Sequence, residues 1–259
     1  MEVRLDGRVI LVTGAAQGVG QAIALEVARS GAGGVFITDR NPDKAEATLA
    51  ALREIGVDAA FFAADLVEAS APARIFSAAL HRFGRIDGLV NAAGLTDRAS
   101  LQRATTDLWD TLFAVNARAP FFLMQALVAH LKDRKSPGSM VNILSINVHG
   151  GATDLTVYSA SKAALALATR NAAHGHRFDR IRINGINLGW TDTPGERHMQ
   201  SITLGHPRWI EEATAKLPFG RLLNPDDVAR LTVFLLSDAS APMTGALIDQ
   251  EQSVVGPRD

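Results

Sequence analysis

Short apolar runs alternate with longer amphipathic stretches along the chain. Residues 8–13 form a continuous apolar run, which is typical of a strand covered on both faces. The next stretch, 18–30, places Val19, Ile23 and Val27 at helical spacing. The same two patterns predict further strands over 33–39, 58–64, 87–91, 139–145, 181–187 and 246–249. They predict further helices over 42–55, with Asn41 as cap and Pro42 in the first turn, and over 68–83, 105–135, 157–177 and 225–237, the last capped by Asn224.

This alternation predicts the α/β class. We expect a single doubly wound, Rossmann-type domain over residues 1–259, with about seven parallel strands and helices on both faces. No repeat, low-complexity segment or linker divides the sequence. Ligands of such sheets bind beyond the carboxyl ends of the strands, so the residues that end each strand are the candidates for chemistry.

Composition narrows the class of function. The 26 basic and 27 acidic side chains leave a net charge of −1, so we expect no nucleic-acid or membrane partner. There is no cysteine, and the histidines lack ligand spacing, so no metal site is expected. The first residues lack a signal-type apolar core, and the longest apolar stretch, 121–131, is interrupted and too short to cross a bilayer. We therefore expect a cytoplasmic protein.

A glycine-rich turn follows the first predicted strand and opens a helix. Glycine lets the backbone approach a pyrophosphate, and the free N–H groups of the new helix point at the anion. The strand–turn–helix context distinguishes this turn from an ordinary one. The predicted phosphate-binding residues are Gly14, Gln17, Gly18, Val19 and Gly20.

Asp39 ends the second strand, nineteen residues after Gly20. A carboxylate there can accept both ribose hydroxyls of an adenosine and repels a 2′-phosphate, although a helix-start residue is the plainer alternative. Arg40 follows and could serve a phosphate instead. Because no Lys or Arg lies inside the glycine turn, the sequence favours NAD over NADP.

The third and fourth strands end in further candidates for cofactor binding. Small residues there would let the backbone pass close to a ring or sugar, while plain turns would explain the same residues equally well. The candidates are Asp65, Leu66, Asn91, Ala92 and Gly94.

Tyr158 is the only tyrosine, and Lys162 lies four residues later on the same helix face. A phenol has a pKa of about 10 and is a poor base at neutral pH. A nearby ammonium favours the phenolate, and a useful lowering of the pKa requires roughly 3–4 kcal/mol of differential stabilisation. The alternative is an ordinary exposed helix pair.

Two polar residues complete this candidate catalytic group. Ser145 ends the fifth strand, where its hydroxyl could hold a substrate oxygen against the phenol or merely cap the strand end. Asn116 lies in an otherwise apolar helix, where asparagine is unfavourable. It could bind a water that relays protons from Lys162, or satisfy a core carbonyl.

These motifs together resemble the compact branch of the short-chain dehydrogenase/reductase family. The resemblance runs from about Arg4 to Gly245, and it is carried by Thr13-Gly14 with Gly18 and Gly20, Asp65, Asn91-Ala92-Ala93-Gly94, Asn116, Ser145, and Tyr158-Ser-Ala-Ser-Lys162.

The resemblance implies a role for each matching residue. Tyr158 would be the general acid/base, and Lys162 would bind the nicotinamide ribose and lower the tyrosine pKa. Ser145 would position the substrate oxygen, and Asn116 would complete a proton relay. Asp39 resembles the NAD-selecting acid. The family further implies a homotetramer, or sometimes a dimer, built on long helices such as the one that contains Asn116.

Two segments depart from the family pattern. Where the family usually has Pro-Gly after the sixth strand, this chain runs from Asn187 through Gly189, Trp190 and Thr191 to Thr193. Gly189, Thr191 and Thr193 remain predicted cofactor contacts, and Thr193 matches the position that contacts the carboxamide. Where the family commonly has Asp-Gly-Gly, the chain has Asp249-Gln250-Glu251-Gln252, which could face a subunit interface or an active site.

Residues 190–216 lie where the family keeps its lid, so we expect either a closing flap or a satellite helix pair there. Asn147, His149, Thr153 and Trp190 are the candidate substrate contacts. Their polar character favours a sugar or polyol.

The sequence thus predicts an NAD-dependent oxidoreductase that interconverts a secondary alcohol and a ketone by hydride transfer. One alternative is an NADPH-dependent carbonyl or acyl-thioester reductase. Another is a non-catalytic dinucleotide-binding regulatory protein.

Overall fold

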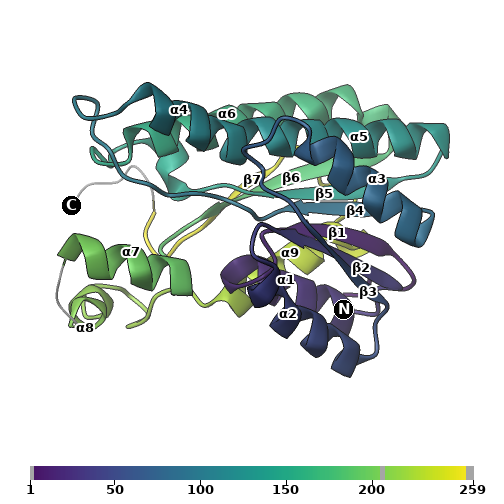
Figure 1. The fold of residues 1–259 in the computed structure, drawn as a ribbon, viewed down its shortest axis with the longest axis horizontal. Coiled ribbons are helices and arrows are strands. Elements are labelled where there is room, and N and C mark those ends of the chain that lie inside the picture. Colours follow the sequence, from purple (N-terminus) through teal and green to yellow (C-terminus); the bar gives the residue numbers. More distant parts are fainter. Residues whose placement is uncertain (1–2, 205–207, 255–259) are drawn as a thin grey trace.

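The computed structural model describes residues 3–204 and 208–254 of the chain, and its centre is a parallel sheet (Figure 1). The sheet has seven strands in the order β3-β2-β1-β4-β5-β6-β7, and every neighbouring pair is parallel. This is the predicted doubly wound arrangement, whose strand order reverses between β1 and β4 and opens a crevice at their carboxyl ends. The strands are β1 (Val9–Thr13), β2 (Gly34–Asp39), β3 (Ala59–Ala63), β4 (Gly88–Asn91), β5 (Gly138–Ile143), β6 (Ile181–Leu188) and β7 (Leu247–Gln250).

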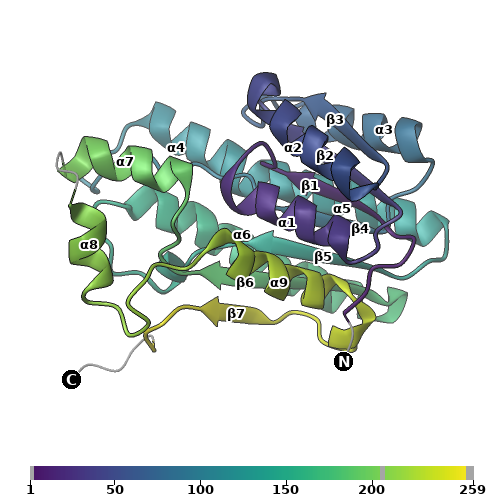
Figure 2. The same ribbon diagram turned by 90° about the horizontal axis from the view of Figure 1, so that it is seen from below.

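Helices cover both faces of the sheet. Helices α1, α2 and α9 lie on one face and α3 to α6 on the other, while α7 and α8 stand beyond the sheet at the end where β6 and β7 finish (Figures 1 and 2). The helices are α1 (Gly18–Arg29), α2 (Pro42–Ile55), α3 (Ala71–Phe83), α4 (Thr106–Phe113), α5 (Ala119–Asp133), α6 (Thr156–Gly175), α7 (Pro194–Leu204), α8 (Trp209–Thr214) and α9 (Pro225–Leu236).

The strands divide the core into two layers because successive side chains point to opposite faces. Leu11 packs with the helices of the α3–α6 face, whereas Ile10 and Val12 pack with α1 and α9. Leu89 and Val90 on β4 alternate in the same way. Burying each such side chain contributes about 1.5–3 kcal/mol, so the continuous apolar runs are explained by a sheet with no solvent-facing side.

Local sequence signals place the starts of two helices as predicted. The Asn41 side chain accepts a hydrogen bond from the Lys44 N–H at 3.1 Å, and Pro42 stands in the first turn of α2. Asn224 begins α9 with a capping box in which Asp227 accepts the Asn224 N–H at 2.9 Å. These side chains satisfy N–H groups that a helix start leaves without partners.

The expected single helix over 105–135 is interrupted. A π-helical turn over Ala114–Arg118 separates α4 from α5. Pro120 has no N–H, so the α-helical hydrogen bond to the Asn116 carbonyl cannot form, and the local pattern must change. The whole run Thr106–Asp133 is long and apolar enough to cross a bilayer by length and composition, but half of its most apolar window is buried inside the protein.

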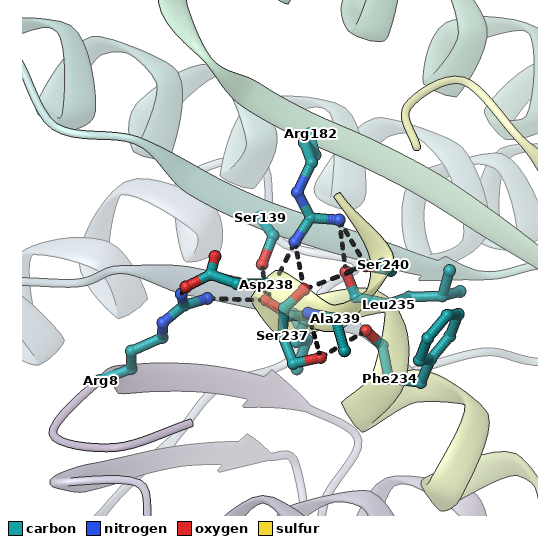
Figure 3. Close-up of polar contacts among 10 residues, drawn as sticks. Arg8, Ser139, Arg182, Phe234, Leu235, Ser237, Asp238, Ala239 and Ser240 are labelled. Carbon is teal, nitrogen blue, oxygen red and sulfur yellow. Dashed lines mark hydrogen bonds and ion pairs between the residues drawn. The ribbon is translucent and has the colours of Figure 1, made fainter. Parts of the chain in front are cut away.

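The C-terminus of α9 is anchored by a guanidinium from the sheet (Figure 3). Arg182 on β6 donates from Nη1 to the Leu235 carbonyl at 2.9 Å and to Ser240 Oγ at 2.7 Å. Its Nη2 donates to the carbonyls of Leu236 and Ser237 at 3.2 and 2.8 Å. Burial lowers the pKa of this guanidinium, but its partners are the negative end of the helix.

Two further donors converge on the same helix end. Arg8 Nη1 and Ser139 Oγ reach the Leu236 carbonyl at 2.8 and 2.6 Å, respectively (Figure 3). Residues from β5, β6 and the segment before β1 thereby hold α9 against the sheet.

Replacing Arg182 by Met should lower the free energy of unfolding by about 3 kcal/mol, because it removes the hydrogen bonds that a partly buried charged donor makes to the end of α9. Urea unfolding of the variant measures this. Arg53→Met is the matched control, since its ion pair with Glu46 is largely exposed and should be worth less than about 1 kcal/mol. Equal losses in the two variants would show that the anchor is not stabilising.

Candidate active site

A cavity of about 990 Å³ lies at the carboxyl ends of the strands, between the sheet and α7. It is lined by the glycine turn, by the ends of β2 to β6, by the first turns of α6 and by α7. The predicted site residues that line it are Gly14, Gln17, Gly18, Val19, Gly20, Asp39, Arg40, Asp65, Leu66, Ala92, Gly94, Ser145, Asn147, Tyr158, Lys162, Gly189, Trp190, Thr191 and Thr193.

The glycine turn packs so closely on the exit of β4 that side chains are excluded. Gly14 has a φ of +67°, and a Cβ there would lie 2.6 Å from the Ala93 Cα. A Cβ on Gly20 would lie 2.2 Å from the Gly14 carbonyl oxygen. Thr13 Oγ1 holds the other side by accepting the N–H groups of Ala92 and Ala93, both at 3.1 Å.

The start of α1 remains open to an anion. Its N-cap residue, Gln17, makes no side-chain capping hydrogen bond, so the first N–H groups of the helix face the cavity without a side-chain partner. This cradle, in which the glycines leave the backbone uncovered by side chains of their own, fits the pyrophosphate of a dinucleotide. The residues that would hold it are Gly14, Gly18 and Val19.

Asp39 lies at the rim of the cradle with its carboxylate fixed by backbone groups. Oδ2 accepts the Ala16 N–H at 3.2 Å, and Oδ1 accepts the Asn41 N–H at 3.1 Å. A carboxylate has about four acceptor sites, so two remain for ribose hydroxyls. Two cations share this rim: Arg40, which was predicted, and Lys44, whose Nζ donates to Gln17 Oε1 at 3.0 Å.

The predicted catalytic residues Ser145, Tyr158 and Lys162 meet on the opposite side of the cavity, and all three are buried. Tyr158 and Lys162 stand one turn apart on α6, and Ser145 follows β5. The Ser145 hydroxyl lies close enough to Tyr158 to lower the pKa of the phenol, and its Oγ accepts the Asn147 N–H at 3.2 Å. Lys162 Nζ donates to the Ile143 carbonyl at 2.8 Å.

The protonation of this pair differs from the sequence expectation. Burial raises the pKa of Tyr158; the hydrogen bond from Ser145 opposes the rise, and the charge of Glu196 adds to it. Lys162 is not among the groups that shift the pKa of Tyr158, and its Nζ donates to the carbonyl of Ile143. The expected acidification of the phenol by Lys162 is therefore not seen in the protein alone.

The Asn116 side chain is buried and does not line the cavity; it connects the segment after β4 to helix α6. Oδ1 accepts the Leu95 N–H at 2.9 Å, and Nδ2 donates to the Leu95 carbonyl at 2.9 Å and to Ser161 Oγ at 3.0 Å. A Cβ on Gly94 would lie 3.3 Å from Lys162 Nζ and 3.4 Å from Asn116 Oδ1. These bonds satisfy backbone groups of Leu95, as one of the two roles considered for this side chain requires, and the water relay stays a prediction.

Three other predicted contacts are not brought to the cavity. Asn91 is buried within the sheet, where its amide donates to Asn142 Oδ1 at 2.8 Å. His149 pairs with Asp249 at 3.0 Å beside the end of β7. Thr153 lies in the loop before α6. Their place in the sequence, near a strand end or in the Ser145–Tyr158 loop, did not reveal the direction of their side chains.

Residues 190–216, the predicted lid, fold largely as α7 and α8. Residues 205–207 of this span lie outside the described residues. Helix α7 covers one side of the cavity, and Trp190 stacks on Trp209 with ring centroids 5.9 Å apart.

Sequence reasoning missed five charged residues that line the cavity: Lys44, Asp97, Arg98, Glu196 and Glu251. Lys44 could have been found, because a helix that starts at the cofactor edge directs its first turn there. Glu251 lies in the terminal segment that departs from the family pattern. Arg98 and Glu196 come from loop and α7 positions that no periodicity marks.

Comparison with known proteins agrees with this geometry. A family model described as "Enoyl-(Acyl carrier protein) reductase" matches residues 14–250. The chain is 33% identical to the short-chain dehydrogenase/reductase FrzI of Cladobotryum sp, over 95% of each sequence. It is 32% identical to the sorbitol dehydrogenase of Cereibacter sphaeroides, over 98% of each.

A solved structure gives the same result for the fold. The putative NAD(P) dependent gluconate 5-dehydrogenase of Beutenbergia cavernae, with bound NADP, superposes with a TM-score of 0.88 at 28% identity, covering 97% of this chain and 98% of that one. Sequence and fold therefore place this chain in the short-chain dehydrogenase/reductase family of oxidoreductases.

Proposed function

We propose that the protein is an NAD-dependent oxidoreductase that interconverts a secondary alcohol and a ketone. The observation that carries this proposal is that Ser145, Tyr158 and Lys162 meet in the wall of a cavity that also contains the glycine cradle. The hydroxyls of Ser145 and Tyr158 can hold a substrate oxygen and exchange its proton. A bound nicotinamide supplies the hydride acceptor or donor.

Each side chain then has a distinct task. Ser145 orients the substrate oxygen, and Tyr158 Oη takes the hydroxyl proton during oxidation or returns it during reduction. Lys162, whose pKa burial lowers to about 8, still carries its proton at neutral pH and can bind ribose hydroxyls. Because the phenol alone has a raised pKa, oxidation requires positive charge near Tyr158, which an oxidised nicotinamide would provide.

The Asp39 carboxylate at the ribose end of the cradle supports NAD as the cofactor. NADP is the alternative, because Arg40 and Lys44 stand at the same rim and the gluconate 5-dehydrogenase relative has NADP bound. We favour NAD since a fixed carboxylate repels a 2′-phosphate at close range.

A polyol or sugar is the substrate class we favour. Asn147 and Trp190, two of the predicted substrate contacts, line the cavity, and the relative from Cereibacter sphaeroides is a sorbitol dehydrogenase. The description of the family model supports the alternative of an acyl-thioester reductase. A non-catalytic regulatory protein would have no need of the Ser145–Tyr158 pair.

We further propose that the protein works in the cytoplasm as a homo-oligomer, a tetramer or a dimer. Supporting this, Trp109, Phe121, Phe122 and Leu167 expose large apolar side chains on the layer formed by α4, α5 and α6. Apolar side chains grouped on one layer favour association with a second copy.

Replacing Tyr158 by Phe should reduce turnover at least about a hundredfold while leaving NAD affinity unchanged, because only the proton carrier is lost. The assay is NADH formation from a panel of polyols, sugars, hydroxy acids and cyclic alcohols, with NAD titrated by calorimetry. Turnover that survives in the variant would refute the proton role.

Replacing Asp39 by Ser should lower the preference for NAD over NADP, measured as the ratio of kcat/KM values, by about tenfold or more. The variant removes the repulsion of the 2′-phosphate while keeping a polar side chain. Lys44→Gln should act in the opposite direction by weakening NADP alone. A wild-type protein that already prefers NADPH would contradict the cofactor assignment.

The buried Lys162 also makes stability depend on pH. Its pKa of about 8 lies below the value of about 10.4 in an unfolded chain, so the folded protein binds fewer protons between these values. Stability from this group therefore rises with pH across that window, and below pH 8 the full penalty of roughly 3 kcal/mol applies.

Lys162→Met removes this penalty, so its free energy of unfolding, relative to wild type, should fall by roughly 2–3 kcal/mol as the pH rises from about 7 to about 10. Denaturant titrations at both pH values give the difference, with the exposed Lys216→Met as the surface reference. A relative stability that is constant with pH would mean that Lys162 is not held in a desolvated state.

A further inference from the structure

The side of the cavity beyond Ser145 and Tyr158, here called the substrate side, has more negative than positive side chains. Beyond Ser145 and Tyr158, its wall includes three carboxylates and one guanidinium among the described residues: Asp97, Glu196, Glu251 and Arg98. The remaining charged groups of the cavity, apart from the buried Lys162, belong to the nucleotide side, around Asp39 and Asp65.

Carboxylates match both terminal nitrogens of the Arg98 guanidinium, while its Nε is buried and has no partner among the described residues. Its Nη1 contacts Asp154 Oδ2 at 3.2 Å, and its Nη2 lies 3.8 Å from Glu196 Oε1. An anionic group of a substrate would have to displace these partners, and it would meet the charge of Glu251 as well. The wall is therefore unfavourable for carboxylates, sulfonates and phosphates.

Glu196 is held in place while keeping one oxygen available. Its Oε1 accepts hydrogen bonds from Trp190 Nε1 at 2.8 Å and from Gln200 Nε2 at 2.6 Å. Within the described part of the chain, its Oε2 accepts none. Glu196 and Tyr158 line the same cavity, and the Glu196 charge contributes to the raised pKa of Tyr158.

Glu251 closes the same wall from the C-terminal segment. Its Oε2 accepts the Trp190 N–H at 3.3 Å and lies against Gly189, where a Cβ would come within 2.3 Å of that oxygen. Trp190 is thus fixed by one carboxylate at its indole and by another at its backbone, and both carboxylates border the cavity.

We propose that Glu196 is a specificity-determining residue, which accepts a hydrogen bond from a hydroxyl or ammonium group of the substrate near the reacting carbon, and that the Glu196–Glu251 wall excludes substrates with an anionic group there. The inference rests on the proposed function and names the substrate class of that site. A hydroxyl and an ammonium group share one property: each donates a hydrogen bond and carries no negative charge. The ammonium form gains the larger attraction because it also compensates the wall charge.

Four matched alcohols separate these possibilities: cyclohexanol, cyclohexane-1,2-diol, 2-aminocyclohexanol and 2-hydroxycyclohexanecarboxylate. Their binding to the NAD complex of Tyr158→Phe is measured by calorimetry, which needs no turnover. The diol or the amino alcohol should bind about tenfold or more tightly than cyclohexanol, and the carboxylate should bind least. A carboxylate that binds as well as the diol and the amino alcohol, or absence of binding by both donor-bearing probes, would overturn the inference.

Glu196→Gln is introduced into the same Tyr158→Phe background. It should lower the affinity for the amino alcohol, relative to cyclohexanol, by about tenfold or more, and it should raise the affinity for the carboxylate. Glutamine keeps an oxygen for Trp190, and Glu251→Gln provides a second variant of the wall. Glu211→Gln, on the exposed side of α8, is the matched control and should leave the order of binding unchanged. Unchanged selectivity in both wall variants would show that the carboxylates do not choose the substrate.

Turnover by the wild-type enzyme is read separately. If none of the four alcohols yields NADH although the order of binding is as expected, the proposed oxidation fails while the specificity of the wall stands. If NADH is formed with no discrimination between the probes, the reverse holds.

Discussion

The contact between the glycine turn and the exit of β4 is the constraint on which the site depends. At Gly14 there is no room for a Cβ before the Ala93 backbone, and at Gly20 none before Gly14 itself. The turns that follow β1 and β4, the adjacent parallel strands at the reversal of strand order, thereby pack backbone against backbone. This contact fixes the position of the glycine turn. It thereby places the N–H groups at the start of α1 and the Asp39 carboxylate around the cavity.

The wall of the cavity that contains Tyr158 and Lys162 costs stability, because it buries two titratable side chains. Burying Tyr158 and Lys162 disfavours the charged form of each, since both are removed from water. The fold tolerates this because Lys162 retains a carbonyl partner and Asn116 ties the neighbouring loop to the helix layer. The protein alone thus offsets only part of the cost of burying Tyr158 and Lys162. A bound dinucleotide would bring a positive charge near the phenol and ribose hydroxyls as partners for the ammonium.

Charge on the substrate side differs from charge on the nucleotide side. Near the ribose end, cations from Arg40 and Lys44 stand beside the Asp39 carboxylate, whereas around Trp190 the carboxylates of Glu196 and Glu251 dominate. Because these groups face a partly enclosed space, their fields are less screened than those of surface residues. The same cavity can therefore accept a phosphate-rich cofactor at one end and disfavour anions at the other.

The sequence by itself determined the layers of the fold, the glycine turn and the order of the reacting residues. Apolar runs, caps such as Asn41 and the Tyr158–Lys162 spacing are local properties that need no knowledge of neighbours. Tertiary structure alone decided which polar side chains face the cavity, because a residue at a strand end can point either way. Thus Asn91 and His149 turned to partners elsewhere, and Arg98 and Glu196 entered the site from segments without a periodic pattern. The raised pKa of Tyr158 was likewise beyond the sequence, since its burial and the approach of Ser145 and Glu196 arise only when distant segments pack.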